Sequence, residues 1–155
     1  MTPIKFTVLG VPQTKGSTRA FTPKGARFPV ITSTNPHGKA WEKTVALGAI
    51  HARGAGQPVY LGAVELDLMF YLPRPQRLAK KATPPHTKRP DLDKYIRCIG
   101  DALTGIIWAD DGQIVRIVAS KAYHEAGDQP RATITVRPID LALFTHAPLT
   151  KEAIQ

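Results

Sequence analysis

The sequence predicts an α/β fold, more closely an α+β sandwich, with a mixed β-sheet, two main helices and a single domain. Residues 59–72 alternate apolar and polar side chains, which is the pattern of a strand with one buried face. Apolar residues from Leu92 to Leu103 recur every three to four positions, which predicts an amphipathic helix. A chain of 155 residues has room for one hydrophobic core, so residues 1–155 are expected to form one domain.

The other elements follow from the same periodicities and from turn residues between them. Residues 10–36 are rich in Pro, Gly, Ser and Thr and are expected to form a loop. The tail at 138–155 contains Leu141, Leu143 and Phe144, and it packs either on the core or on a second subunit. The remaining predictions are a strand at 4–9, a helix at 37–53, strands at 113–123 and 131–137, and a turn at 128–130.

The composition favours a cytoplasmic protein that binds no membrane. The apolar runs are too short to span a bilayer, and the first residues lack the basic and apolar regions of a secretion signal. Cys98 is the single cysteine, which rules out an internal disulfide and suits a reducing compartment. Trp41 and Trp108 are expected in the core, and Trp108 is the better candidate of the two for stacking on a nucleic-acid base.

The charge distribution points to a polyanionic partner. The net charge is +9, and residues 1–39 and 73–90 each carry six basic residues and no acid. A solvated loop usually mixes charges of both signs, so acid-free loops indicate contact with nucleic-acid phosphates. The predicted DNA-binding residues are Lys15, Arg19, Lys24, Arg27, Lys80, Lys81, Lys88 and Arg89.

The carboxylates are concentrated beside the second basic loop. Five of the twelve acids lie between Asp91 and Asp111. Each has an ordinary explanation: Asp91 could cap the helix, Asp93 could oppose its dipole, and Asp111 could start a tight turn. Asp101 is expected to form a salt bridge or a hydrogen bond from the helix to a loop. Acids gathered next to a phosphate-binding loop make better sense if a divalent cation lies between them and the phosphate.

The block from Lys88 to Lys121 resembles the RusA family of Holliday-junction resolvases. The stretch Gly10-x-Pro12-x-x-Lys15 with Arg19 resembles the opening strand and basic loop of the family more loosely. The residues that carry the main resemblance are Asp91-Leu92-Asp93, Asp101-Ala102-Leu103, Asp110 to Val115, and Lys121.

The resemblance implies a phage- or prophage-derived nuclease in a bacterial host, active in recombination and repair. Such an enzyme is a homodimer that binds branched DNA, especially four-way junctions, and nicks two strands symmetrically. It uses Mg²⁺, with Mn²⁺ as a possible substitute. The metal ligands by position are Asp91, Asp93 and Asp111, with Asp110 adjacent. This sequence has Lys94 where the family has Asn.

The family's lysine three positions further on is replaced by Arg97 in this chain. Arg97 can stabilise charge on a phosphate but cannot transfer a proton at ordinary pH. Whether Lys94 or Arg97 takes over the role of the family's lysine is left open by the sequence, and Lys121 is a third candidate for stabilising charge. Together with the three metal-ligand aspartates, these cations complete the predicted catalytic set.

Two other functions remain open at this point. A non-catalytic protein that binds junctions or single-stranded DNA would use the basic loops, with Phe21, Phe28 and Tyr95 stacking on bases. A phosphotransferase with an Asp-x-Asp nucleophile is the weaker alternative, because that motif normally follows an apolar strand directly. Here Lys88-Arg89-Pro90 precedes it.

Overall fold

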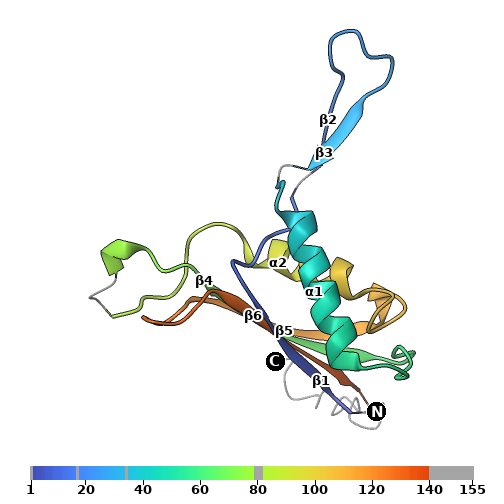
Figure 1. Cartoon of the computed structure of the whole chain (residues 1–155), viewed down its shortest axis with the longest axis vertical. Helices are drawn as coiled ribbons and strands as arrows, with labels where there is room; N and C mark the ends of the chain where they lie inside the picture. The colour runs from blue at the N-terminus through green and yellow to red at the C-terminus, as the bar shows by residue number, and fades with distance from the viewer. Residues whose placement is uncertain (1, 17, 34, 79–81, 140–155) are drawn as a thin grey trace, which may run out of the picture.

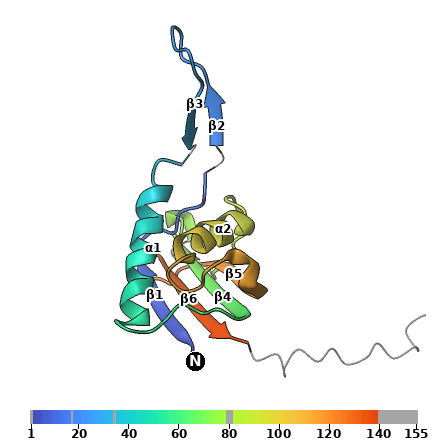
Figure 2. The same ribbon diagram turned by 90° about the vertical axis from the view of Figure 1, so that its right-hand side faces the viewer.

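A mixed four-stranded sheet with two helices on one face forms the body of the molecule (Figures 1 and 2). The structure is a computed structural model that describes residues 2–16, 18–33, 35–78 and 82–139, without the side chains of residues 18, 19 and 31–33. The sheet order is β1-β6-β4-β5. The strands are β1 (Ile4–Leu9), β4 (Val64–Leu72), β5 (Ile114–Tyr123) and β6 (Arg131–Pro138), and the helices are α1 (Gly38–Arg53) and α2 (Leu92–Leu103).

The predicted α+β single-domain fold is therefore confirmed. Strand β4 alternates buried and partly buried residues along its whole length, as the sequence pattern predicts. It begins at Val64, later than the expected residue 59, because the chain from Tyr60 to Gly62 follows another path. The backbone N–H of Tyr60 donates to the carbonyl oxygen of Ile107 at 2.7 Å, outside the sheet ladder.

Residues 10–36 are not loop throughout, so the sequence prediction for this segment is partly wrong. Strands β2 (Thr18–Phe21) and β3 (Val30–Ser33) form an antiparallel hairpin that projects away from the body (Figures 1 and 2). Both strands contain β-branched or aromatic residues, which favour extended backbone. The surrounding Pro, Gly, Ser and Thr hide this signal, because each strand is only four residues long. We call residues 18–33 the arm.

The core lies between the sheet and the two helices. Helix α1 buries Trp41, Val45 and Ala49, three of the four residues that predicted it. It approaches β1 so closely that a Cβ on Gly48 would lie 3.2 Å from the Phe6 ring, so a glycine suits this contact. Helix α2 lies beside α1 and packs its apolar side onto the sheet, with the Tyr95 ring 5.0 Å from that of Phe70.

The topology brings both acid-free segments to the same end of the molecule. Strands β1, β4 and β5 run in one direction, because β6 is antiparallel to both β1 and β4 and β5 is parallel to β4. The arm follows β1, and the basic segment 73–90, which contains the short helix η1 (Gln76–Leu78), follows β4. This end also holds the first residues of α1 and α2 (Figure 1). We call it the basic end.

Candidate functional site

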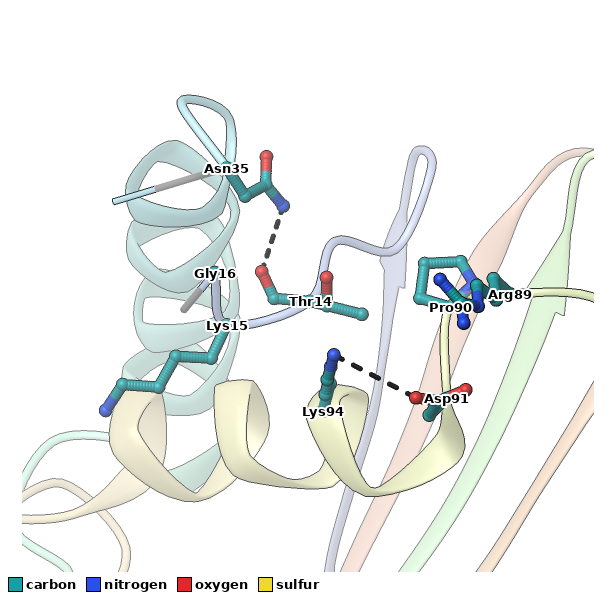
Figure 3. Close-up of a pocket in the computed structure, with 8 residues that line it drawn as sticks. All are labelled: Thr14, Lys15, Gly16, Asn35, Arg89, Pro90, Asp91 and Lys94. Carbon is teal, nitrogen blue, oxygen red and sulfur yellow. Dashed lines mark hydrogen bonds and ion pairs between the residues drawn. The ribbon is translucent and has the colours of Figure 1, made fainter. Parts of the chain in front are cut away.

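A pocket of about 460 Å³ opens at the basic end, between the base of the arm and the start of α2. Figure 3 shows how its walls come from segments far apart in the sequence. Lys94 and Asp91 line the side of the pocket formed by α2. The Lys94 ammonium nitrogen lies 3.9 Å from a carboxylate oxygen of Asp91 (Figure 3). Three cationic residues and one carboxylate therefore share one hollow, lined by Thr14, Lys15, Gly16, Asn35, Arg89, Pro90, Asp91 and Lys94.

Asp91 occupies the N-cap position of α2, but its carboxylate makes no capping hydrogen bond. The capping explanation considered for this residue is therefore not supported by the structure. The Asp91 side chain is 60% exposed, and its carboxylate forms an ion pair with the Lys94 ammonium group. Asp93 follows in the first turn and is exposed as well. Both carboxylates of the Asp-Leu-Asp motif thus reach solvent beside the pocket, where a ligand could contact them.

Lys121, on β5, fixes the backbone that leads into this motif. Its ammonium group donates to the carbonyl oxygens of Lys88 at 2.8 Å and Pro90 at 2.7 Å. Lys121 lies opposite Phe70 on the face of the sheet that the helices cover. The predicted catalytic role of Lys121 remains a prediction, but its position gives it a task in holding the Asp91 corner in place.

A second ion pair ties the base of the arm to α2. The Lys15 ammonium group pairs with Asp101, and the backbone N–H of Lys15 donates to the carbonyl oxygen of Lys94 at 3.1 Å. Figure 3 shows the Lys15 side chain running along α2 away from the pocket. The expected link from Asp101 to a loop is confirmed. Lys15 is then engaged by a protein carboxylate, although it remains a predicted DNA contact.

Asp111 lies near the other end of α2. Its carboxylate accepts hydrogen bonds from the Thr104 hydroxyl and from Nε1 of Trp108, the latter at 2.9 Å. Trp108 is fully buried, so it belongs to the core and is not available for base stacking. A Cβ on Gly100 would lie 3.7 Å from the Asp111 carboxylate, so this glycine leaves room for it. These neighbours hold the Asp111 side chain over the last turn of α2.

Asp110 serves the local turn, which forms the short helix η2 (Asp111–Gln113). Its carboxylate accepts from the backbone N–H of Gly112 at 2.7 Å, while the Gln113 side chain accepts from the backbone N–H of Asp110. This capping box satisfies donors that would otherwise be unpaired at the start of η2. The proposal that Asp110 binds a metal ion remains a prediction.

The acids of the motif are spread along α2. Gly100, beside Asp111, is seven positions after Asp93, and a helix rises about 1.5 Å per residue, so roughly 10 Å of helix lies between them. Among the residues that the structure describes, no three His, Cys, Asp or Glu side chains form a group that could hold a metal ion. Within one chain, Asp91, Asp93 and Asp111 do not make a complete metal site.

Burial shifts the pKa of several groups near the site. Burial raises the pKa of Tyr95 to about 12. It also raises the pKa of the Cys98 thiol to about 12, and the nearby Glu42 and Asp101 carboxylates add to this effect. Burial lowers the pKa of His86, whose ring packs 4.4 Å from that of Tyr123, and Lys121 lowers it further. These groups remain neutral near pH 7.

The predicted DNA-binding residues fall into three sets. Lys24 and Arg27 are exposed on the arm, and Lys88 and Arg89 are exposed on the basic segment. The side chain of Arg19, with Lys80, Lys81 and the tail from residue 140, lies outside the described residues. Lys15, the remaining predicted residue, lies within the described residues and forms an ion pair with Asp101.

Some residues that shape the site carried no clear signal in the sequence. The Asn35 amide donates to the carbonyl oxygen of Thr14 at 2.9 Å and so joins the two segments that flank the arm. The Asn35-Pro36 pair before a helix marks a turn, but it does not reveal this contact. Tyr95, considered for base stacking, is only 3% exposed, so that suggestion is wrong.

Comparison with known proteins places these features in a family. The model of the endodeoxyribonuclease RusA family matches residues 10–137. The uncharacterized protein YqaN of Bacillus subtilis (strain 168) is 31% identical over 145 residues, which cover 88% of this chain and 96% of that protein. The fold and the basic end define a small α+β protein with exposed carboxylates beside cations. The chain belongs to the RusA family of endodeoxyribonucleases.

No helix in the described ranges has the length and apolar character needed to cross a membrane.

Proposed function

We propose that this chain is a structure-selective DNA endonuclease that resolves four-way junctions by paired nicks. The observation that carries the proposal is the position of Asp91-Leu92-Asp93 within a chain that the RusA model matches over residues 10–137. Both carboxylates are exposed at the start of α2, and Asp91 lines a pocket whose other charged residues are all cations. A carboxylate here would repel a DNA phosphate unless it served chemistry at that phosphate.

Mg²⁺, with Mn²⁺ as a substitute, is the cofactor that we propose. Carboxylate oxygens are the ligands that these hard cations prefer, and Asp91 and Asp93 offer two of them at one helix start. The described residues of one chain do not bring Asp111 into the same group, so a single chain does not fit the ion completely.

The cations around the motif would hold and polarise the substrate. Lys94 and Arg97 lie one and four positions after Asp93 on α2, where they can approach a phosphate held at the corner. Arg97 remains charged at any working pH, so it would stabilise negative charge that builds on the phosphate oxygens. Cleavage by attack of water would leave a 5′-phosphate and a 3′-hydroxyl.

The exposed cations at the basic end would contact the DNA backbone on either side of the cleaved bond. Contacts of this kind position the duplex without reading its sequence. Selectivity for a four-way junction would then come from the shape of the substrate and from the spacing of two active sites in a homodimer. We therefore include the dimer and the symmetric pair of nicks in the proposal.

A labelled synthetic four-way junction and a linear duplex of the same sequence test the activity. The protein is expected to cut the junction in Mg²⁺, to cut it in Mn²⁺, and to leave it intact in EDTA. Asp91→Asn should abolish cleavage while a mobility-shift assay in Ca²⁺ still shows junction binding. Junction binding without scission in any of these metals would identify a non-catalytic binding protein.

A plasmid that extrudes a cruciform tests the pairing of nicks. Two nicks in one binding event convert the supercoiled circle directly to the linear form. Independent single nicks produce an open circle first. Linear product from the earliest time points is expected, and accumulation of open circles would contradict paired cleavage.

A further inference from the structure

The arm carries exposed apolar side chains that the body of the protein does not cover. Phe28 is 72% exposed and Phe21 is 47% exposed. Val30, in register with Phe21 on the facing strand, is 46% exposed. Exposed apolar side chains that lie together, unlike scattered ones, mark an interaction site. The arm therefore indicates a partner that takes up its aromatic rings.

The arm also stands apart from the core. In the described residues β2 pairs only with β3, and the hairpin projects from the body (Figures 1 and 2). None of residues 20–30 is buried. An isolated two-stranded hairpin is marginally stable in water. A partner that binds the arm would thus add stability that the body does not supply.

The tip of the arm is a tight turn that presents Phe28 beyond the paired strands. The backbone N–H of Ala26 donates to the carbonyl oxygen of Pro23 at 3.0 Å. Gly25, inside this turn, has a φ of +88°, a backbone conformation that glycine adopts without strain. Phe28 follows the turn by two residues and is the most exposed ring of the arm.

The charges beside these rings identify the partner as nucleic acid. Lys24 and Arg27 are exposed on either side of the turn, and residues 1–39 contain no acid. Cations that hold phosphates, together with aromatic rings that stack on bases, are the combination that binds exposed bases. A protein partner would have to be acidic over the same surface. DNA is already proposed at the basic end, from which the arm rises.

The base of the arm is fixed to the helix that begins with the Asp-Leu-Asp motif. The Lys15 ammonium group pairs with Asp101, and the backbone N–H of Lys15 donates to the carbonyl oxygen of Lys94 at 3.1 Å. On the other side of the arm, the Asn35 amide donates to the carbonyl oxygen of Thr14 at 2.9 Å. The arm therefore starts from a defined point beside the candidate active site.

A four-way junction offers base faces that a linear duplex does not. In a continuous duplex each base pair is covered by its stacked neighbours. Where four duplexes meet, stacking is interrupted, and an apolar side chain can enter there at a smaller cost of unstacking. Ring stacking on the arm is therefore a contact that branched DNA allows and linear DNA resists.

We propose that Phe28, assisted by Phe21, stacks on a base at the branch point of a four-way junction, while Lys24 and Arg27 hold the adjacent phosphates. The inference rests on the proposed nuclease function and names the residue that makes it select branched DNA. The two kinds of contact differ in what they recognise. The cations bind any duplex, whereas the ring binds only where a base face is uncovered.

Binding to two DNAs of the same sequence tests this difference. In a mobility-shift assay in Ca²⁺, Phe28→Ala should weaken binding of the four-way junction about tenfold and leave binding of the linear duplex unchanged. Phe28→Tyr keeps an aromatic ring and should bind both DNAs like the parent. Leu47→Ala is the matched control, because Leu47 is 67% exposed on α1, and it should weaken neither complex.

Fluorescence tests the stacking directly. Phe28→Trp places an indole on the arm, and stacking on a base quenches indole emission. The emission should fall when the four-way junction is added in Ca²⁺ and remain unchanged with the linear duplex. The parent protein gives the background from Trp41 and Trp108, which are both buried. Leu47→Trp is the control and should show no quenching with either DNA.

Equal weakening of both complexes by Phe28→Ala, or no weakening of either, would overturn the stacking role, as would an unquenched Phe28→Trp. If the parent still cuts the junction in that case, the nuclease function stands, and the arm binds a protein or a membrane surface instead. A parent that neither cuts nor prefers the four-way junction would refute the proposed function and this inference with it.

Discussion

The ammonium group of Lys121 donates a 2.7 Å hydrogen bond to the carbonyl oxygen of Pro90, the residue that precedes Asp91. A second bond from the same group reaches the carbonyl oxygen of Lys88 at 2.8 Å. These bonds connect the far end of β5 to the last residues of the basic segment. The position of the Asp91 carboxylate thus depends on a side chain thirty residues later in the sequence.

Lys121→Met is expected to lower the free energy of unfolding by about 2 kcal/mol, because two carbonyl oxygens lose a charged donor. Junction cleavage should fall as well, since the Asp91 corner is no longer held. Urea unfolding followed by circular dichroism measures the first effect. Lys43→Met, an exposed change on α1, is the control and should alter neither quantity. Unchanged stability in Lys121→Met would show that water replaces these bonds at no cost.

Trp108→Phe should remove a hydrogen bond to the Asp111 carboxylate and leave an aromatic ring in the core. The change removes the indole donor to Asp111 while an aromatic ring still fills most of the buried space. We expect a loss of about 1–2 kcal/mol in unfolding free energy and a clear drop in cleavage, because the Asp111 carboxylate loses a partner that orients it.

Trp41→Phe is the matched control for this change. Trp41 is also buried, but its Nε1 has no hydrogen-bond partner in the part of the chain that the structure describes. Replacement by Phe therefore removes no hydrogen bond there and should leave cleavage close to the parental rate. Equal losses of cleavage in the two variants would show that aromatic volume, and not the bond to Asp111, is what matters.

The sequence predicted the sheet, both long helices and the single domain, because these depend on local periodicity. The alternation in β4 and the apolar stripe of α2 each report one buried face, whatever the partner elements are. The arm was missed because four-residue strands among Pro and Gly have too few alternations to stand out.

The site was harder to predict because it depends on long-range contacts. The motif spacing identified Asp91, Asp93 and Asp111 by resemblance, but spacing alone does not say that Asp111 is held by Thr104 and Trp108 over the end of α2. The contacts of Lys121 with Pro90 and of Lys15 with Asp101 join residues that are distant in the sequence. No local pattern encodes such contacts.

Cys98 predicts a loss of stability at alkaline pH. Burial raises the pKa of this thiol to about 12 in the folded chain, from an ordinary value of 9.0. The unfolded chain therefore releases the proton first as the pH rises above about 9, while the folded chain retains it. Below that pH the contribution to stability is complete, and it is lost as the pH rises from about 9 towards 12, by about 1.4 kcal/mol per pH unit.

Cys98→Ala should flatten this decline. Urea unfolding of the parent and the variant at pH 8, 9 and 10 compares the slopes, and the parent should lose more stability in the last interval. Tyr95 acts in the same direction at higher pH, because burial raises its pKa to about 12 as well. Parallel curves for the two proteins would mean that the thiol ionises equally in the folded and unfolded chains.

The arm should contribute phosphate contacts whose number can be counted. Lys24 and Arg27 are exposed near its tip, and residues 1–39 carry no acid that could neutralise them. Each phosphate contact releases bound counterions, so the logarithm of the binding constant falls with the logarithm of salt concentration by about 0.9 per contact on duplex DNA. Lys24→Gln with Arg27→Gln should therefore reduce the salt slope for junction binding by about two. Lys43→Gln removes an exposed cation from α1 and should leave the slope unchanged, whereas an equal reduction in both variants would mean that net charge, and not contact by the arm, governs binding.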